Sequence, residues 1–237
     1  MHVACGTSGW SYPPWRGSFY PEKWPTSKML AYYGERLGAV EVNNTFYRMP
    51  KEDVLQGWAA EVPASFRFAV KSPQRITHQL RLVDATETVV RFATVARALG
   101  ERLGPVLFQL PPFLRKDADR LRGFLDVWRE HAPGIDAAFE FRHASWFDDE
   151  IFGILRAGQV ALCLAEGEAL DTPVVATTGW GYLRLRKVEY TEAELDVWVG
   201  RLRQQSWTHA YVFFKHEDGA TGPRLAADFT RRLMSDM

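Results

Sequence analysis

Cysteine is scarce in this chain, which has only Cys5 and Cys163 among its 237 residues. Each lies in an apolar run, and no Cys-x-x-Cys pair or metal-type spacing accompanies them. We therefore expect two buried thiols and a reduced, cytoplasmic protein. The first six residues, MHVACG, lack the basic start and long apolar stretch of a signal peptide. No apolar run reaches the length of a membrane span, so no membrane partner is expected.

An excess of either charge is also absent. Lysine and arginine total 29 and aspartate and glutamate total 29, which gives a formal net charge of zero. Nucleic-acid and membrane partners usually require a basic excess, so binding to nucleic acid is not favoured, although a local basic pocket remains open. With 46% hydrophobic and 24% charged residues, the composition is that of an ordinary globular protein.

Three common motifs are missing. No Gly-x-Gly-x-x-Gly turn follows the first apolar run, which disfavours a doubly wound nucleotide-binding sheet. The His-Glu-x-x-His motif of zinc proteases is absent, and so is the Gly-x-Ser-x-Gly elbow of serine hydrolases of the α/β-hydrolase type.

What the chain does contain is a regular alternation of short apolar runs with helical patterns. The predicted strands are 2–6, 39–43, 66–71, 105–110, 136–142, 160–164, 182–186 and 211–215. The predicted helices are 27–37, 51–61, 84–102, 117–131, 147–157, 191–205 and 222–235. Such alternation indicates parallel strands joined by helical crossovers, and eight of them close most simply into an α/β barrel of the TIM type.

The boundaries of this barrel can be refined in places. Ser27 and Thr191 are predicted helix N-caps, and Pro133-Gly134 is predicted to end the helix before the fifth strand. Residues 165–181 are rich in glycine, threonine and proline, so this one crossover is expected to be irregular. No linker or repeat divides the chain, and residues 1–237 are interpreted as one domain.

Polar side chains gather late in the predicted strands. Since side chains alternate between the two faces of a strand, the apolar positions assign the intervening polar ones to the barrel interior. The candidates at these strand ends are Glu41, Asn43, Lys71, Gln109, Glu140, Arg142, Arg184, Arg186 and Lys215. Barrel enzymes place their sites at this carboxyl-end face.

Cations outnumber anions in this set, because five lysines and arginines face only two glutamates. The surplus predicts a small anionic ligand, since arginine forks match carboxylate and phosphate groups and lysine adds a point charge. Glu41 or Glu140 would then act as general base if its neighbours tune its pKa. The alternative is structural: the two glutamates pair with two of the cations inside the barrel.

Aromatic residues are concentrated in residues 7–25, directly after the first strand, so this segment is expected over the same face. Trp15, Phe19 and Trp24 are interpreted as packing within the segment. The candidates for ligand contact near the rim are Ser8, Trp10, Tyr12, Thr45, Tyr47 and Trp146.

Histidines offer a weaker signal. His143 follows the fifth strand and is a candidate catalytic residue, either as general acid or as a polar loop residue. With Glu41 and 216–218 (His-Glu-Asp) it could hold a divalent metal, which is not favoured because the spacing is poor. The glycine-containing stretch 218–222 before the last helix is a weak phosphate-binding signal.

These segments together resemble the YecE-like family, domain-of-unknown-function family seventy-two. The resemblance is carried by 6–12 (GTSGWSY), Trp15, Gly17, 19–21 (FYP), 40–43 (VEVN), 45–47 (TFY), Pro50, 66–71 (FRFAVK), 104–112 (GPVLFQLPP), 140–143 (EFRH), 145–146 (SW) and 211–216 (YVFFKH). It implies a TIM-type barrel and no particular reaction. Two stretches depart from the family pattern: 215–218 (KHED) replaces an Asn-rich stretch, and 184–186 (RLR) replaces Arg-x-His.

Three functions remain open at this point. The first is an enzyme, of hydrolase, lyase or isomerase type, acting on a small phosphate- or carboxylate-bearing substrate. The second is a metal-dependent phosphodiesterase or nucleic-acid-binding barrel, and the third is a ligand-binding barrel without catalysis. The sequence indicates neither the reaction nor the oligomeric state.

Overall fold

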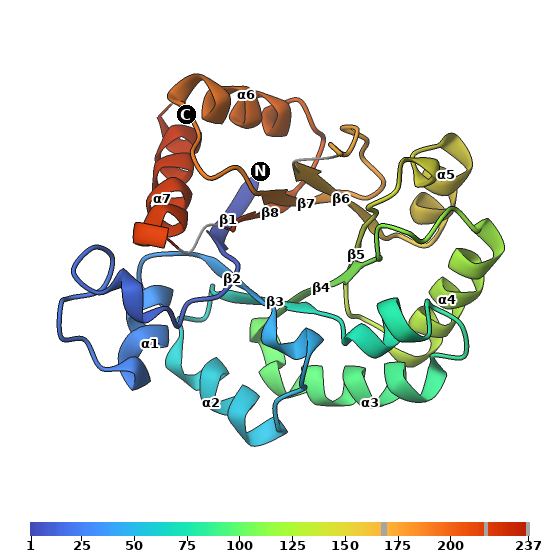
Figure 1. Ribbon diagram of the computed structural model, residues 1–237, viewed down its shortest axis with the longest axis horizontal. Coiled ribbons are helices and arrows are strands. Elements are labelled where there is room, and N and C mark those ends of the chain that lie inside the picture. Colours follow the sequence, from blue (N-terminus) through green and yellow to red (C-terminus); the bar gives the residue numbers. More distant parts are fainter. Residues whose placement is uncertain (167–169, 216–217, 236–237) are drawn as a thin grey trace.

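The computed structural model describes residues 1–166, 170–215 and 218–235. Its centre is a closed barrel in which eight parallel strands pair in chain order, and β1 pairs with β8 to complete the ring. Helices surround this ring on the outside (Figure 1). The predicted TIM-type barrel is therefore confirmed.

Each predicted strand corresponds to one observed strand. The strands are β1 (His2–Thr7), β2 (Ala39–Val42), β3 (Arg67–Lys71), β4 (Leu103–Gln109), β5 (Ala137–Glu140), β6 (Ala161–Glu166), β7 (Trp180–Leu185) and β8 (His209–Phe214). Several boundaries differ by one or two residues.

The helices also follow the predicted order. They are α1 (Met29–Gly34), α2 (Glu52–Glu61), α3 (Thr86–Ala96), α4 (Ala118–His131), α5 (Asp149–Ala157), α6 (Glu192–Arg203) and α7 (Thr221–Met234). Short 3₁₀ turns span Pro13–Trp15, Thr26–Lys28, Asn44–Phe46, Arg97–Arg102, Ala144–Trp146 and Asp218–Ala220, and a π-helical turn spans Arg75–Gln79.

Helix ends test the predicted caps. Thr191 caps α6 in a capping box with Glu194, and α4 ends at His131, just before Pro133-Gly134, so both predictions are confirmed. The prediction for Ser27 is wrong, because Ser27 lies inside a 3₁₀ turn and α1 begins one residue after Lys28.

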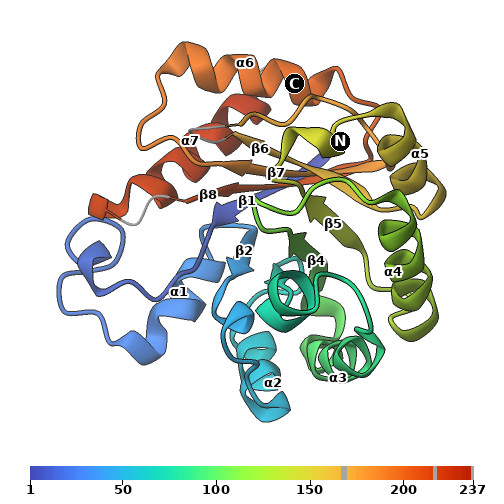
Figure 2. The same ribbon diagram turned by 45° about the vertical axis from the view of Figure 1, so that its right-hand side comes forward.

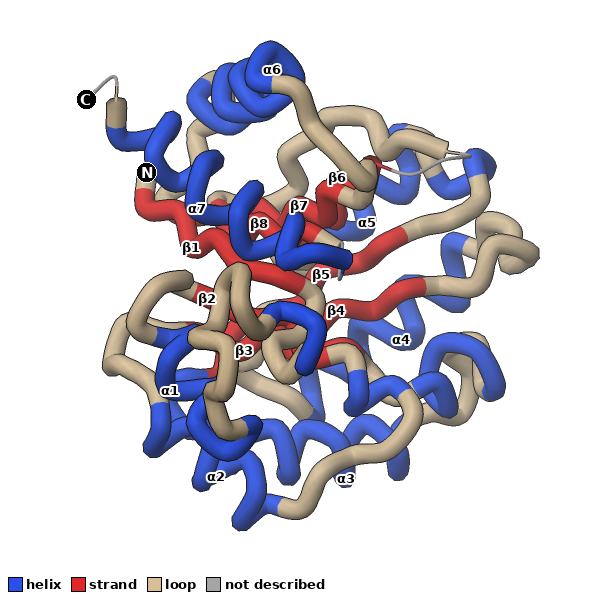
Figure 3. Tube along the Cα trace, turned by 60° about the vertical axis from the view of Figure 1, so that its left-hand side comes forward, coloured by secondary structure: helices blue, strands red, loops and turns tan. Residues whose placement is uncertain are grey.

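The crossover between β6 and β7 is irregular, as predicted. Residues 170–179 contain no helix (Figure 3). Threonine side chains hold part of this segment against β6: Thr177 Oγ1 accepts a hydrogen bond from the Leu162 amide at 2.8 Å and donates one to the Val160 carbonyl at 2.8 Å. The Thr177 hydroxyl thus satisfies two backbone groups at the start of β6, the Leu162 amide and the Val160 carbonyl.

Two apolar layers stabilise the barrel. The larger lies between the strands and the surrounding helices, which Figure 2 shows around the outside of the barrel. The smaller fills the barrel interior and consists of Ala4, Ala39, Ala69, Leu107, Ala138, Ala161, Cys163, Ala165, Trp180, Tyr182, Tyr211 and Phe213. Four of these residues, Ala39, Ala69, Leu107 and Ala138, each precede a polar candidate by two positions, so the predicted alternation holds and the polar side chains form the next layer up.

Gly6 shows how closely β1 approaches β2. A Cβ atom there would meet the Ala39 carbonyl oxygen at 1.7 Å, so only glycine fits. The Tyr33 hydroxyl from α1 bridges the two strands: it accepts a hydrogen bond from the Thr7 amide at 2.8 Å and donates one to the Ala39 carbonyl at 2.9 Å. This junction positions the residues that follow Thr7 beside β2.

The aromatic segment after β1 lies elsewhere than expected. Instead of covering the carboxyl-end face it extends outward beside α1 (Figures 1 and 2). Its rings pack on α1, since Phe19 contacts Tyr32 and Tyr33 with ring centroids 5.7 and 6.0 Å apart and Trp24 contacts Tyr32 at 5.2 Å. The segment is therefore self-packed against a helix, as interpreted for Trp15, Phe19 and Trp24.

Both cysteines are buried free thiols, as predicted, and burial raises the pKa of Cys5 to about 12.

Within the described residues, none of the helices combines the length and apolar character needed to cross a membrane.

Candidate active site at the carboxyl ends of the strands

Two buried glutamates form the centre of the polar layer. Glu41 is the next-to-last residue of β2 and Glu140 is the last residue of β5, and their exposed fractions are 0% and 1%. Arg184 of β7 lies between them and pairs with both, with its Nη2 at 2.8 Å from Glu41 Oε1 and its Nη1 on Glu140 Oε2. Arg186 pairs with the second oxygen of Glu140. The structural alternative weighed from the sequence, internal pairing, is thus confirmed for these two arginines.

Glu41 also accepts hydrogen bonds from three neutral side chains. Ser8 Oγ donates at 2.8 Å, Asn43 Nδ2 at 3.1 Å and Tyr182 Oη at 2.7 Å. Together with Arg184, four donors from β7, the loop after β1 and the loop after β2 therefore converge on one carboxylate. Such dense hydrogen bonding fixes the side chain and favours its ionised form.

The pKa values of both glutamates reflect two opposed effects. Burial alone would raise the pKa of each carboxyl, but the adjacent Arg184 charge and the hydrogen bonds outweigh it. The net result lowers the pKa of Glu41 and lowers the pKa of Glu140 to about 2. Both groups are carboxylates at neutral pH, and their proton affinity is low.

Lys71, at the end of β3, has a different environment. Its Nζ donates to Gln109 Oε1 at 2.8 Å and lies 4.2 Å from the centre of the Phe46 ring. Among the residues that the structure describes, no carboxylate lies within ion-pair distance of this amine, and Glu41 and Glu140 act on it only from further away. Burial, followed by the charge of Arg184, lowers the pKa of Lys71 to about 8.

Gln109 links the lysine to the ion-paired glutamates. Its Nε2 donates to Glu140 Oε1 at 2.9 Å, which leaves its carbonyl oxygen to accept from Lys71. Because carboxylates accept and do not donate, Glu140 sets the orientation of this amide. The polar layer is therefore one connected network from Ser8 to Lys71.

Three candidates lie at the edge of this network. Arg142 and Lys215 are exposed, beyond the ends of their strands. His143 is half-buried, and its Nδ1 accepts from the Ser145 amide at 3.2 Å at the start of the turn Ala144–Trp146. The structure thus does not bring these three side chains into the central ion pairs.

The aromatic candidates contribute mainly to packing. Trp10 contacts Trp58 of α2 at 4.9 Å between ring centres, and Tyr12 donates from Oη to the Ser8 carbonyl at 2.7 Å. Trp146 is fully buried, stacks on Phe141 at 4.7 Å and donates from Nε1 to the Leu114 carbonyl, which leaves no ring surface for a ligand.

The two candidates from the loop after β2 differ sharply from each other. Thr45 is fully buried and donates to the carbonyls of Val42 and Lys71, so it ties the ends of β2 and β3 together. Tyr47 is 75% exposed, and its ring lies 5.0 Å from that of Phe46.

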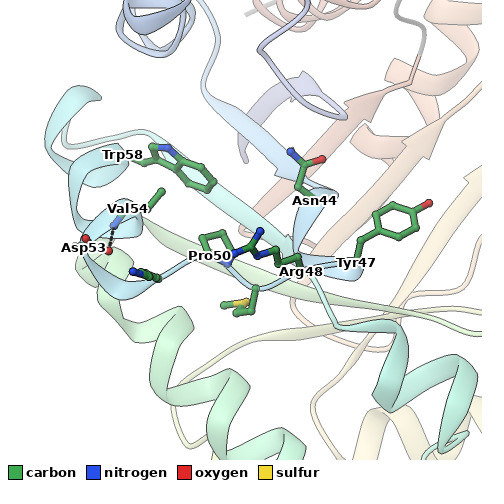
Figure 4. A pocket seen from close by; sticks show the side chains of 9 residues that line it. Asn44, Tyr47, Arg48, Pro50, Asp53, Val54 and Trp58 are labelled. Carbon is green, nitrogen blue, oxygen red and sulfur yellow. Dashed lines mark hydrogen bonds between the residues drawn. The ribbon is translucent and has the colours of Figure 1, made fainter.

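A groove of about 720 Å³ lies next to the network, along the loop from β2 to α2. It is lined by Asn44, Tyr47, Arg48, Met49, Pro50, Lys51, Asp53, Val54 and Trp58. In Figure 4, Trp58 and Tyr47 lie at opposite ends of the lining with Arg48 between them. The groove adjoins Lys71 through Phe46, whose ring contacts both Lys71 and Tyr47.

Metal ligands do not gather in the described part of the chain, where no three histidine, cysteine or carboxylate side chains form a group that could hold an ion. His216 and Glu217, two members of the metal set considered from the sequence, lie outside the described residues.

A family model now accounts for nearly the whole chain. Residues 4–237 match the model described as a protein of unknown function, DUF72. The chain belongs to the DUF72 family. The resemblance noted from the sequence is therefore confirmed.

Relatives of this DUF72 protein agree with that assignment. It is 33% identical to the protein YecE of Escherichia coli K12 over 147 residues, which cover 61% of this chain and 50% of YecE. It is 30% identical to YunF of Bacillus subtilis over 160 residues, or 63% of this chain and 54% of YunF. The match thus spans about half the length of these curated relatives.

Solved structures extend the comparison. A DUF72 protein of Thermotoga maritima superposes with a TM-score of 0.86 at 27% identity, covering 98% of this chain and 99% of the other. D-psicose 3-epimerase of Clostridium cellulolyticum superposes with a TM-score of 0.57 at 10% identity, covering 97% and 98% of the two chains. The epimerase likeness shows a shared fold only.

Sequence reasoning missed two side chains of the DUF72 site, Tyr182 and Phe46. Tyr182 precedes Arg184 by two residues, so the same alternation that placed Arg184 inside the barrel also places the tyrosine there. Phe46 lies in the turn Asn44–Phe46 after β2, where no strand periodicity indicates direction.

Proposed function

We propose that this DUF72 protein is an enzyme that binds a small phosphate- or carboxylate-bearing substrate at the carboxyl-end face and moves a proton with Lys71. The observation that carries the proposal is the contrast within the polar layer. Arg184 and Arg186 are paired with buried carboxylates, whereas Lys71 contacts an amide and an aromatic ring.

Charge balance supports an anionic substrate. Glu41 and Glu140 carry two negative charges and Arg184 and Arg186 carry two positive ones, so this part of the layer is neutral. Among the residues that the structure describes, protonated Lys71 has no carboxylate within ion-pair distance, and an anionic substrate would neutralise its charge. Exposed Arg142 and Lys215 lie at the rim, where they would attract such an anion.

The pKa of Lys71, about 8, supports proton transfer by this residue. A group whose pKa lies near the working pH can both release and accept a proton, whereas the glutamates, held in ion pairs with lowered pKa values, bind a proton weakly. In this proposal the glutamates hold Arg184, Arg186 and Gln109 in place. The groove beside Phe46 offers room for the rest of the substrate.

The proposal is tested by thermal unfolding in increasing phosphate, with chloride matched for ionic strength. Saturation at one hundred times the dissociation constant adds about 2.7 kcal/mol. For a chain of this size each kcal/mol moves the midpoint by roughly 2–4 °C, so a rise of about 5–11 °C is expected. Lys71→Met should abolish the rise, while Lys23→Met, which removes an exposed lysine elsewhere, should preserve it.

A saturable rise that depends on Lys71 directs a screen of phosphorylated and carboxylated metabolites, first for stabilisation and then for turnover. The proposal fails if wild type shows no saturable rise or if Lys71→Met responds like wild type. Turnover by Lys71→Met equal to that of wild type would exclude the proton-transfer role.

A further inference from the structure

The amine of Lys71 has a different environment from the amines of two ion-paired lysines, Lys116 and Lys187. Lys116 pairs with Asp148 and Glu150 at 2.6 and 2.9 Å, and Lys187 pairs with Glu166 and Glu194 at 3.1 and 2.9 Å. Those carboxylates raise the pKa of both amines. Lys71 instead contacts the Phe46 ring and an amide oxygen, and the charges of Arg184 and Arg186 lower its pKa.

This environment favours the neutral amine. With a pKa of about 8, about a tenth of Lys71 is uncharged at pH 7. An ordinary lysine is uncharged in only about one molecule in three thousand at that pH. Desolvation together with neighbouring cations is a recognised way to activate a lysine as a nucleophile.

We infer that Lys71 forms an imine with the substrate, and that the substrate is therefore an aldehyde or ketone carrying a carboxylate or phosphate. The inference rests on the proposed function for the anionic group and adds the carbonyl. Its geometric basis is the placement of Nζ at the carboxyl-end face, beside Phe46 and within 2.8 Å of an oriented acceptor.

The chemistry balances without any redox partner. The neutral amine attacks the carbonyl carbon, and a C–N bond forms as the carbonyl oxygen takes up a proton. The C–O bond then breaks and a C=N bond forms. The water that leaves contains the former carbonyl oxygen and the two hydrogens of the amine. Hydrolysis reverses the step and restores the lysine.

Gln109 is the positioning residue for this product. A protonated imine keeps a single N–H, and Gln109 Oε1 already accepts a hydrogen bond from the same nitrogen. The amide cannot turn its NH₂ group toward Lys71 without losing its 2.9 Å bond to Glu140. The acceptor is thus held in place before the substrate arrives, which favours the iminium over the free amine.

The test uses glyoxylate, an aldehyde with a carboxylate, together with sodium cyanoborohydride, which reduces imines to stable secondary amines. Peptide mapping by mass spectrometry then locates each carboxymethylated lysine. At pH 7 we expect Lys71 to react about tenfold faster or more than Lys23, Lys116 and Lys187, with a rate that reaches half its maximum near pH 8.

Two variants complete the experiment. Lys71→Arg removes the fast site and should leave the slow lysines unchanged. Gln109→Leu keeps the amine but removes the acceptor, and it should slow trapping at Lys71 severalfold. If Lys71 reacts no faster than Lys23, the imine is wrong. The proposed function is decided by the other experiment. It stands if the stabilisation by phosphate depends on Lys71, and it is wrong if that stabilisation does not.

Discussion

Replacing Arg184 by methionine removes a side chain that bridges both buried glutamates. Glu41 would keep its bonds from Ser8, Asn43 and Tyr182, and Glu140 would keep Gln109 and Arg186. Breaking a buried pair by removing one partner typically costs about 3–5 kcal/mol, because the remaining charge stays desolvated. At roughly 2–4 °C per kcal/mol, the unfolding midpoint should fall by about 6–20 °C at pH 7.5.

The loss should depend on pH in a defined direction. In wild type the pKa of Glu140 is about 2, below its ordinary value of 4.5, so its contribution is complete above pH 4.5 and disappears as the pH falls toward 2. Without Arg184, each glutamate loses the largest of the effects that lower its pKa, so both pKa values should rise. The variant can then neutralise a carboxylate by protonation, so its deficit should shrink between pH 7.5 and pH 5.

Thermal and urea unfolding at both pH values measure this deficit. Arg129→Met is the matched control, since Arg129 is 74% exposed and pairs only at the surface with Asp126. It should leave the midpoint nearly unchanged. A deficit below about 1 kcal/mol for Arg184→Met, or an equal deficit at both pH values, would refute the assigned ion-pair network.

Two further substitutions test the neighbours of this network. The lowered pKa of Lys71 means that wild type gains stability as pH rises from about 8 to 10.5, because the unfolded chain then binds the extra proton. Lys71→Met should lack that gain, so its stability relative to wild type should fall by up to about 3 kcal/mol across the interval, as measured by urea unfolding. Tyr182→Phe removes a 2.7 Å bond to the Glu41 carboxylate and should cost about 1.5–3 kcal/mol; a cost near zero would mean that the bond does not form.

The fold follows from the sequence because the barrel repeats one pattern. Short apolar runs alternate with helical periods, and all eight predicted strands correspond to observed ones. The predicted start of α1 was wrong for a local reason. Ser27 has a side chain suited to an N-cap, but it lies within a 3₁₀ turn that continues directly into α1.

The site residues that lie on the strands could be predicted from the alternation of side chains between the two faces of a strand. Period two placed Glu41, Lys71, Gln109, Glu140 and Arg184 on the inner face, where the structure also places them. It could not say which charges pair, because that depends on strand register and on the stagger around the barrel.

The residues beyond the strands were harder to predict. Trp146 occurs beside polar candidates in the sequence, yet its ring stacks on Phe141 inside the core. Whether a loop aromatic faces a ligand or the protein depends on tertiary packing, which a single sequence does not encode locally.

The titration of Lys71 tests the central claim most directly. Reductive methylation with ¹³C-formaldehyde labels the lysines, and the Lys71→Arg variant identifies the Lys71 resonance by its absence. A resonance that titrates near pH 8 in wild type, and at higher pH once phosphate is added, is the predicted result, because a bound anion stabilises the charged amine. A Lys71 resonance that titrates near its ordinary value of 10.5 and does not respond to phosphate would contradict the account.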